Sequence, residues 1–232
     1  MLGKQLTHSE MVKAIHRSQH CQRNWDLSKT IPREDIDLII EAATQCPSKQ
    51  NISYYRLHFI TNRDMIEKVY ELTQGAIMDP TNSGPVGGYP PRGRSYTNPQ
   101  TLANLLIVFE RKSLEDIDAG EGPPRNAETY KKANGQLDSS AEWAIERDAT
   151  VAVGIAAGYV NLTSNLMGYS TGCCQCMDPQ GIKELLGMKE VPMLLMGVGY
   201  KNENMNRKIH HADHTVSFGS FKKQKMDVNI IE

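Results

Sequence analysis

The thiols of residues 173–176, with the sequence CCQC, form a CxxC spacing that could carry chemistry. Such a pair could be a redox couple or half of a zinc site, and a strand before it with a helix after it is a setting that can lower a thiol pKa. A zinc site needs two further ligands, which His210, His211 and His214 could supply. Because that histidine run has no standard spacing and no second CxxC occurs, we favour thiols without a reactive role over redox or metal chemistry.

The other two cysteines, Cys21 and Cys46, have the character of small buried apolar residues. Five cysteines are an odd number, and the first twenty residues lack the apolar stretch of a secretory signal. We therefore expect reduced thiols and a cytoplasmic location.

Two basic positions could hold a phosphate, namely Arg23 and the pair Arg207-Lys208. A guanidinium matches a phosphate with a two-pronged hydrogen bond, although a lone arginine is more often a solvated surface residue. The chain contains neither the glycine-rich dinucleotide fingerprint nor the nucleotide P-loop. If a nucleotide-like cofactor binds, scattered basic side chains and loop backbone must hold its phosphate.

The overall charge excludes some function classes. The 232 residues include 26 Lys and Arg against 27 Asp and Glu, a formal net charge of −1. A strong electrostatic grip on nucleic acid or on an anionic membrane is therefore not expected to be the main activity.

The spacing of apolar residues indicates the elements that position these groups. It predicts helices over 9–20, 31–43, 64–72 and 179–186, and strands over 54–60, 102–109, 169–176 and 193–198. Glycine and proline make 75–98 a long loop of the kind that serves as a lid or binding segment, and 110–134 reads as a polar excursion. Residues 1–232 are expected to form one α+β domain, with 201–232 as a polar C-terminal extension.

The stretch from residue 149 to residue 177 carries no formal charge over 29 residues. A membrane span is considered and rejected, because Thr150, Asn161 and Asn165 interrupt it and no positive flank anchors it. A helix that is apolar or small on every side is a buried one. Small residues such as Gly154 and Gly158 let another backbone approach closely, so we place this helix at the centre of the fold or of a dimer.

Several of these segments, in this order, resemble the FMN-dependent nitroreductases. The resemblance covers residues 22–25 (QRNW), the turn 46–51 (CPSKQN) with the helix before it and the strand after it, the charge-free helix, and residues 196–200 (MGVGY). It extends over most of the chain and is weakest over 75–147, the loop and excursion near the active site. It implies a central mixed or antiparallel sheet flanked by helices, and a homodimer with two FMN sites at its interface, where the long buried helix would lie.

The resemblance also implies which residues bind FMN. Those expected near its phosphate and ring edge are Gln19, His20, Cys21 and Arg23, with Arg17-Ser18 as a competing registration, and Arg207 with Lys208 would complete the phosphate site. The turn residues Pro47, Ser48 and Asn51 would approach the flavin from the partner subunit. The residues expected at the ring or ribityl chain are Asn98 and Gln100, and those whose backbone would face flavin N5 are Cys174, Gln175 and Cys176. Two departures stand out, since the family often has Gly-Glu or Glu-Gly at Gln175-Cys176 and an arginine at Gln19.

The implied activity is a ping-pong oxidoreduction in which NADPH or NADH gives hydride to flavin N5 and a small organic acceptor, such as a nitroaromatic or a quinone, takes the electrons. The cofactor carries that chemistry, so no catalytic side chain and no metal is expected. A non-catalytic flavin-binding or regulatory protein of the same fold is the alternative, and a zinc or thiol-redox protein using the CxxC is a weaker one.

Overall fold

The computed structural model describes residues 6–74, 97–113, 116–117, 141–212, 214 and 223–231. The predicted loop over 75–98 and the predicted excursion over 110–134 lie almost entirely outside these residues.

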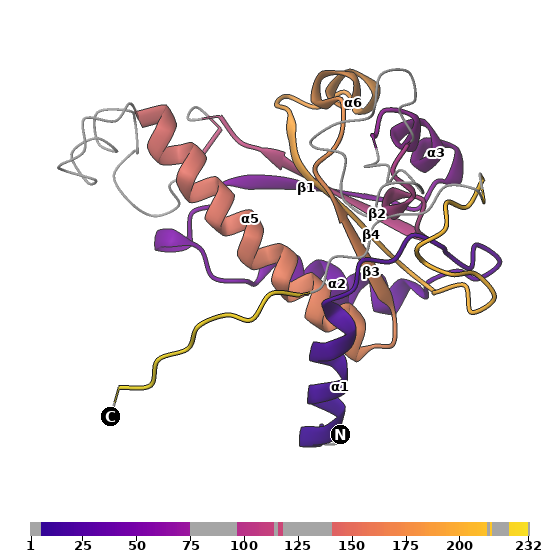
Figure 1. Cartoon of the computed structure of the whole chain (residues 1–232). Helices are drawn as coiled ribbons and strands as arrows, with labels where there is room; N and C mark the ends of the chain where they lie inside the picture. Colours follow the sequence, from indigo (N-terminus) through magenta and orange to yellow (C-terminus); the bar gives the residue numbers. More distant parts are fainter. Residues whose placement is uncertain are drawn as a thin grey trace.

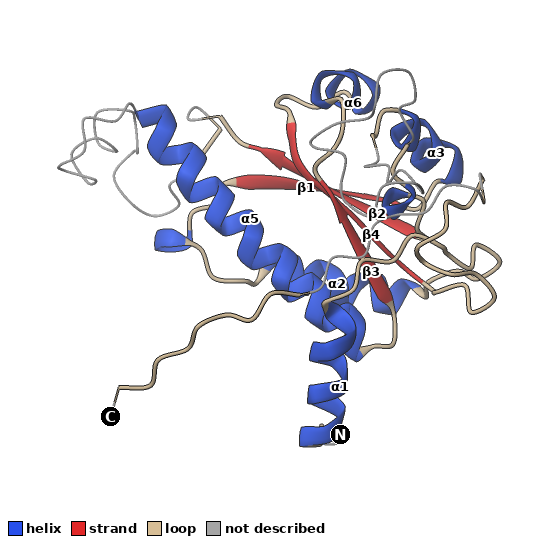
Figure 2. Cartoon of the chain, in the orientation of Figure 1, coloured by secondary structure: helices blue, strands red, loops and turns tan. Residues whose placement is uncertain are grey.

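The core of the molecule is a four-stranded sheet with the order β1-β2-β4-β3. Its strands are β1 (Tyr55–Ile60), β2 (Leu105–Arg111), β3 (Ser170–Cys174) and β4 (Pro192–Gly199). Each neighbouring pair runs antiparallel, and Ile107 at the centre of β2 faces Phe59 on one side and Met196 on the other. The expected α+β class is confirmed, with a wholly antiparallel sheet among the described strands (Figure 2).

Helices cover both faces of this sheet (Figure 1). Successive side chains of a strand point to opposite faces, so Ile107 and Phe109 pack with α2 (Arg33–Thr44) and α5 (Ala141–Leu166). Their neighbours Leu106 and Val108 pack with α3 (Arg63–Glu71) and α6 (Pro179–Leu186). These four β2 side chains are fully buried, and β2 is therefore the centre of two apolar layers.

Polar caps set the ends of several helices. Thr7 and Glu10 form a capping box at the start of α1 (His8–Ser18), and the side chain of Asp178 caps α6. Gly187 ends α6 with a φ of 63°, a left-handed conformation that glycine adopts without strain. The helix predicted over 9–20 runs from His8 to Ser18, so it ends two residues earlier than predicted.

The strand predicted over 169–176 is also shorter and ends at Cys174. It stops there because residues beyond it pair with the end of α3. Gln74 N–H donates to Cys176 O and Asp178 N–H donates to Leu72 O, each at 2.8 Å.

The charge-free stretch forms most of α5 and then turns at Gly168, whose φ is 95°, into β3. One face of α5 is buried through Ala152, Ala156 and Val160. The opposite face is not, since Val151 and Tyr159 are about half exposed at 57% and 47%. Of the two placements predicted for this helix, the centre of the fold or of a dimer, burial within one chain alone therefore accounts for only one face. None of the helices in the described ranges has the length and apolarity needed to cross a membrane.

One buried carboxylate joins three elements at the end of the sheet. The Glu110 side chain is 1% exposed, and Arg56 Nη1 donates to it at 3.0 Å. It also accepts from the backbone N–H groups of Glu190 at 2.9 Å and Lys189 at 3.1 Å. His58 Nε2 lies within hydrogen-bond distance of it, at 2.6 Å. Burial alone would raise the pKa of Glu110, but these bonds outweigh it and hold the pKa below its ordinary value. Bonds from Arg56 and Lys189 likewise lower the pKa of Asp116 to about 2.

This cluster predicts acid sensitivity with a defined sign. A carboxyl whose pKa is lowered by folding stabilises the protein above its unfolded pKa, and this contribution is lost as the pH falls through the folded pKa. We expect the free energy of unfolding to fall between about pH 4.5 and pH 2. In Glu110→Gln, urea unfolding should show a less stable protein at pH 7 and a smaller loss of stability between pH 5 and pH 3. The exposed Glu41→Gln is the control, and an unchanged pH dependence in Glu110→Gln would contradict the prediction.

Candidate functional site

A segment after α1, residues 22–25, crosses the edge strand of the sheet. Gln22 N–H donates to Thr171 O of β3 at 2.8 Å, and its side-chain oxygen accepts the next two backbone N–H groups. Trp25 Nε1 donates to Pro99 O at 2.8 Å, which joins the segment to the short helix η2 (Pro99–Thr101). The side chain of Asn24 donates to the carbonyls of Asn206 and Ile209 at 2.5 and 3.0 Å. Three distant parts of the sequence therefore meet here.

Glycines in the sheet make room for this meeting. A Cβ built on Gly172 would lie 2.6 Å from the Gln22 carbonyl oxygen, and one built on Gly197 would collide with the Gln100 carbonyl oxygen. Backbone cannot move aside as a flexible side chain can. The missing side chains at these positions let the 22–25 segment and η2 lie directly on the sheet.

Positive charges gather beside that segment. The Arg207 charge lowers the pKa of both His20 and Arg23, in each case after the larger effect of desolvation, and Lys223 contributes to the shift at His20. Arg23 and Arg207 carry charges of the same sign, and a bound anion would stabilise both. The structure thus brings together three residues predicted to hold a phosphate, His20, Arg23 and Arg207.

Three other predicted residues form a buried cluster next to these cations. Asn98 Nδ2 donates to Gln100 Oε1 at 2.9 Å and to Cys174 Sγ at 3.1 Å. Asn98, Gln100 and Cys174 are 8%, 5% and 3% exposed. Arg23 acts on the pKa of Cys174, so the cluster and the cations belong to one site.

The exposed end of this site is the loop that follows β3. Gln175 and Cys176 are exposed, and the Cys176 N–H donates to no other described residue. The neighbouring thiols are unreactive by environment, because burial raises the pKa of Cys173 to about 12 and that of Cys174 to about 11. Cys173 and Cys174 therefore contribute little thiolate to the site, and the loop offers backbone groups there.

The turn residues Pro47, Ser48 and Asn51 lie elsewhere in the chain. Figure 1 shows η1 (Lys49–Asn51) on the opposite side of α5 from α3 and α6. Lys49 Nζ lies 2.8 Å from the Asp148 carboxylate, and Asn51 has a φ of 54°. This turn is thus fixed to α5 and contributes nothing to the cluster of its own chain.

The remaining predicted residues are more peripheral. The Gln19 side chain donates to His16 O and finishes α1, while Cys21 is half-buried and contributes to the pKa shift of Cys173. Lys208 follows Arg207 and its N–H bonds the Asn206 side chain. In the competing registration, Arg17 Nη2 donates to Asn165 O at 2.6 Å, and Ser18 bonds the carbonyl of Ile15. Arg17 and Ser18 are therefore bonded to helix backbone.

Sequence reasoning missed Gln22, Thr73 and Lys223 as parts of this site. Gln22 stands inside the QRNW motif, and its place there is the sequence signal that could have pointed to it. Nothing in the sequence around Thr73 or Lys223 indicates their place, which depends on contacts between distant segments.

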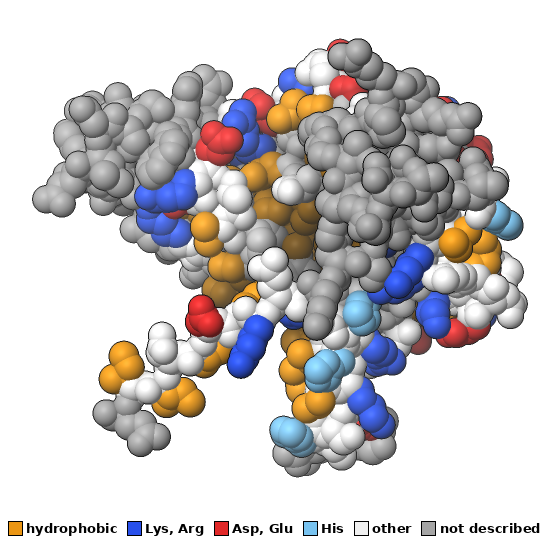
Figure 3. All heavy atoms as spheres, in the orientation of Figure 1, with side chains coloured by type: hydrophobic (Ala, Val, Ile, Leu, Met, Phe, Trp, Pro, Cys, Tyr) orange, Lys and Arg blue, Asp and Glu red, His pale blue; other side chains and the backbone are white. Residues whose placement is uncertain are grey.

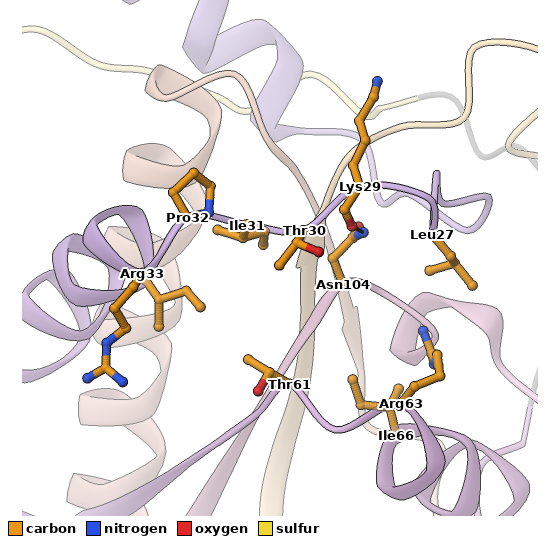
Figure 4. Close-up of a pocket in the computed structure, with 11 residues that line it drawn as sticks. Leu27, Lys29, Thr30, Ile31, Pro32, Arg33, Thr61, Arg63, Ile66 and Asn104 are labelled. Carbon is orange, nitrogen blue, oxygen red and sulfur yellow. Dashed lines mark hydrogen bonds between the residues drawn. The ribbon is translucent and has the colours of Figure 1, made fainter.

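A cavity of about 630 Å³ lies apart from this site, among residues 27–33, the starts of α2 and α3, and Asn104 (Figure 4). Its three lining cations have acidic partners: Lys29 pairs with Asp26 at 3.0 Å, Arg33 with Asp37 at 2.8 Å and Arg63 with Glu67 at 3.2 Å. Figure 4 shows the Lys29 and Arg33 side chains pointing away from each other. The cavity therefore lacks the converging positive charge of the site around Arg23.

The histidines near the C-terminal end of the site do not form a metal centre with the cysteines. Burial, with smaller effects from His210 and His214, lowers the pKa of His211 to about 4. Across the described residues, no three His, Cys, Asp or Glu side chains gather so that they could hold a metal ion.

Comparison with known proteins identifies the class. The nitroreductase family model matches residues 17–200, so the chain belongs to the nitroreductase family. A search of curated proteins finds no match. Membership of this family supports the general assignment of the chain as an oxidoreductase.

Solved structures share the fold at low sequence identity. A candidate NAD(P)H:FMN oxidoreductase from Staphylococcus epidermidis is 18% identical with a TM-score of 0.59, over 89% of this chain and 93% of that one. A candidate nitroreductase from Exiguobacterium sibiricum, in complex with FMN, is 17% identical with a TM-score of 0.59 and the same coverage. A nitroreductase-like protein from Streptococcus mutans is 16% identical with a TM-score of 0.58, over 97% of this chain and all of that one.

The thiol environments lead to a test of the CxxC. Because a thiolate is the reactive form, Cys173 and Cys174 should be alkylated by iodoacetamide at pH 8 more slowly than the exposed Cys176, by on the order of 100-fold. Mass spectrometry of timed samples measures this order, and unfolding in urea should equalise the rates. Rapid formation of a disulfide between Cys173 and Cys176 under mild oxidation would contradict it and favour the redox alternative.

Proposed function

We propose that the chain is an FMN-dependent oxidoreductase that uses NADH or NADPH as donor and reduces a small organic acceptor such as a nitroaromatic or a quinone. The observation that carries the proposal is the convergence of His20, Arg23 and Arg207, whose segments are joined by the bond from Asn24 Nδ2 to Asn206 O, beside a loop with exposed residues. An FMN phosphate is the kind of anion that such a cluster would bind. Family membership and the FMN complex of a protein with the same fold support this choice.

The roles of the residues follow from their positions. Arg23 and Arg207 would bind the phosphate, with His20 and Lys208 at its edge and Gln19 and Cys21 on the segment that carries them. The backbone of Cys174, Gln175 and Cys176 would orient the ring. When bound, FMN supplies the two-electron chemistry between the nicotinamide donor and the acceptor. The protein needs no acid–base side chain of its own for that step.

The same proposal includes a homodimer. Apolar side chains are exposed on α5 and α1 and along residues 223–231, where Met226, Val228, Ile230 and Ile231 are 73–95% exposed. Figure 3 shows such side chains on one face of the molecule, and Figure 1 shows the C-terminal segment extending away from the sheet. Nothing lies within 4 Å of a Cβ built on Gly154 or Gly158, which leaves room for a second backbone. A second copy would cover this face and bring Pro47, Ser48 and Asn51 to the flavin.

Anaerobic spectroscopy of the purified chain tests the activity. We expect the protein to take up FMN on titration. The visible absorbance of the bound flavin should bleach with NADH or NADPH and return with an acceptor. A protein that takes up no FMN would refute the proposal. Uptake without reduction by either nicotinamide would instead identify a flavin-binding protein without turnover.

Removal of one cation tests the phosphate site. Arg207→Ala should weaken FMN binding by about 1.5–3 kcal/mol, roughly 10- to 150-fold in Kd, because a charge-assisted bond to the phosphate is lost. Quenching of flavin fluorescence on titration measures the Kd. Arg33→Ala removes an exposed arginine from α2 and should leave the Kd unchanged. Equal Kd values for both variants would place Arg207 outside the site.

A charge on the exposed face of α5 tests the dimer. Tyr159→Glu should convert a dimer to a monomer, because the interface would have to bury an unpaired carboxylate, whereas the same change on an exposed surface costs little. Light scattering after size exclusion gives the mass. The control is Leu27→Glu, at a residue of matched exposure outside α1, α5 and the C-terminal segment. A monomeric mass for the unmodified chain would refute the dimer.

A further inference from the structure

Asn98 is hydrogen-bonded through both the oxygen and the nitrogen of its side chain. Its side-chain oxygen accepts the N–H of Gln100 at 3.1 Å, and its amide group donates to Gln100 Oε1 and Cys174 Sγ. Its backbone N–H donates to Thr73 Oγ1 at 2.8 Å. With 8% of the residue exposed, these bonds form where water does not compete for them.

These bonds connect three separate elements. Thr73 lies just after α3, Cys174 is the last residue of β3, and Asn98 precedes η2. The end of α3 is bonded in turn to the loop after β3, through Gln74 N–H to Cys176 O and Asp178 N–H to Leu72 O, both at 2.8 Å. Asn98 therefore closes a ring of contacts that fixes residues 174–178 at both ends.

We propose that Asn98 is a positioning residue that holds the loop 174–178 so that its backbone faces the flavin. The inference rests on the proposed function and changes the role that the family resemblance gives this residue. Its side chain is bonded within the protein, so it acts on the flavin through the loop and not by contact.

The chemistry of the amide explains why this position needs asparagine. One nitrogen with two N–H groups serves two acceptors, the Gln100 oxygen and the Cys174 sulfur. An aspartate has nearly the same shape, but its carboxylate can only accept. It would place an acceptor against the Gln100 oxygen and leave the loop without this bond.

Hydrogen–deuterium exchange on the FMN-free protein is the first arm of the test. In Asn98→Asp and Asn98→Ala, amide exchange should rise at residues 174–178 and at 72–74, while the other strands remain protected. The matched control is Asn165→Ala, which removes a 2%-exposed amide that donates to Asn161 O at 2.8 Å within α5. It should leave exchange at 174–178 unchanged.

Flavin titration is the second arm. We expect Asn98→Asp to raise the FMN Kd by roughly tenfold and to shift the absorbance bands of bound FMN, and Asn165→Ala to do neither. Cys174→Ser keeps an acceptor and should resemble the unmodified chain, whereas Cys174→Ala removes it. The effects of Asn98→Ala and Cys174→Ala should be less than additive, since both break the same bond.

The outcomes separate the two hypotheses. An unmodified chain that binds no FMN refutes the proposed function, while exchange still reports on the ring of contacts. If the unmodified chain binds FMN and the Asn98 variants show the same Kd and spectrum, the positioning role is refuted, whatever the amide exchange rates of the variants. If neither Asn98 variant folds, as judged by circular dichroism, Thr73→Val and Cys174→Ala break the ring from its other sides and decide by the same measurements.

Discussion

Close approach of backbone to backbone is the constraint on which the site depends. The segment 22–25 and η2 lie on the sheet only because Gly172 and Gly197 present no side chain there. That contact brings Arg23, Gln100 and Cys174 within range of one another, although they are far apart in the sequence. A larger residue at either glycine would separate the cations from the loop that follows β3.

Much of the fold could be predicted because its signals are local. The continuous apolar run of β2, the Asp178 cap and the Pro32 start of α2 each depend on neighbouring residues, and each element formed close to its expected place. The predicted ends of the elements were less exact where a distant segment takes the backbone hydrogen bonds. Beyond Cys174, pairing with the end of α3 replaces the strand, and no local pattern shows that α3 will lie there.

For the candidate site, the sequence indicated residues that lie together but not the contacts that they make. The resemblance named Arg23, Arg207 and Asn98, and the fold brings the first two together beside His20, where the proposed phosphate site needs them. Asn98 is instead engaged by Gln100, Cys174 and Thr73, which only the folded arrangement reveals. The two alternatives for α5, burial within one chain or within a dimer, stayed open for a similar reason, since absence of charge does not say whether the covering surface belongs to the same chain.

The Glu110 cluster has a consequence beyond stability in acid. β1 is an edge strand of the described sheet, and an open edge can add a strand from another molecule. Arg56 and His58 stand on that strand and are held in place by Glu110. A charged side chain on an edge strand, such as Arg56, discourages continuous sheets between molecules. The carboxylate thus helps to keep the chain from aggregating through its own hydrogen-bonding edge.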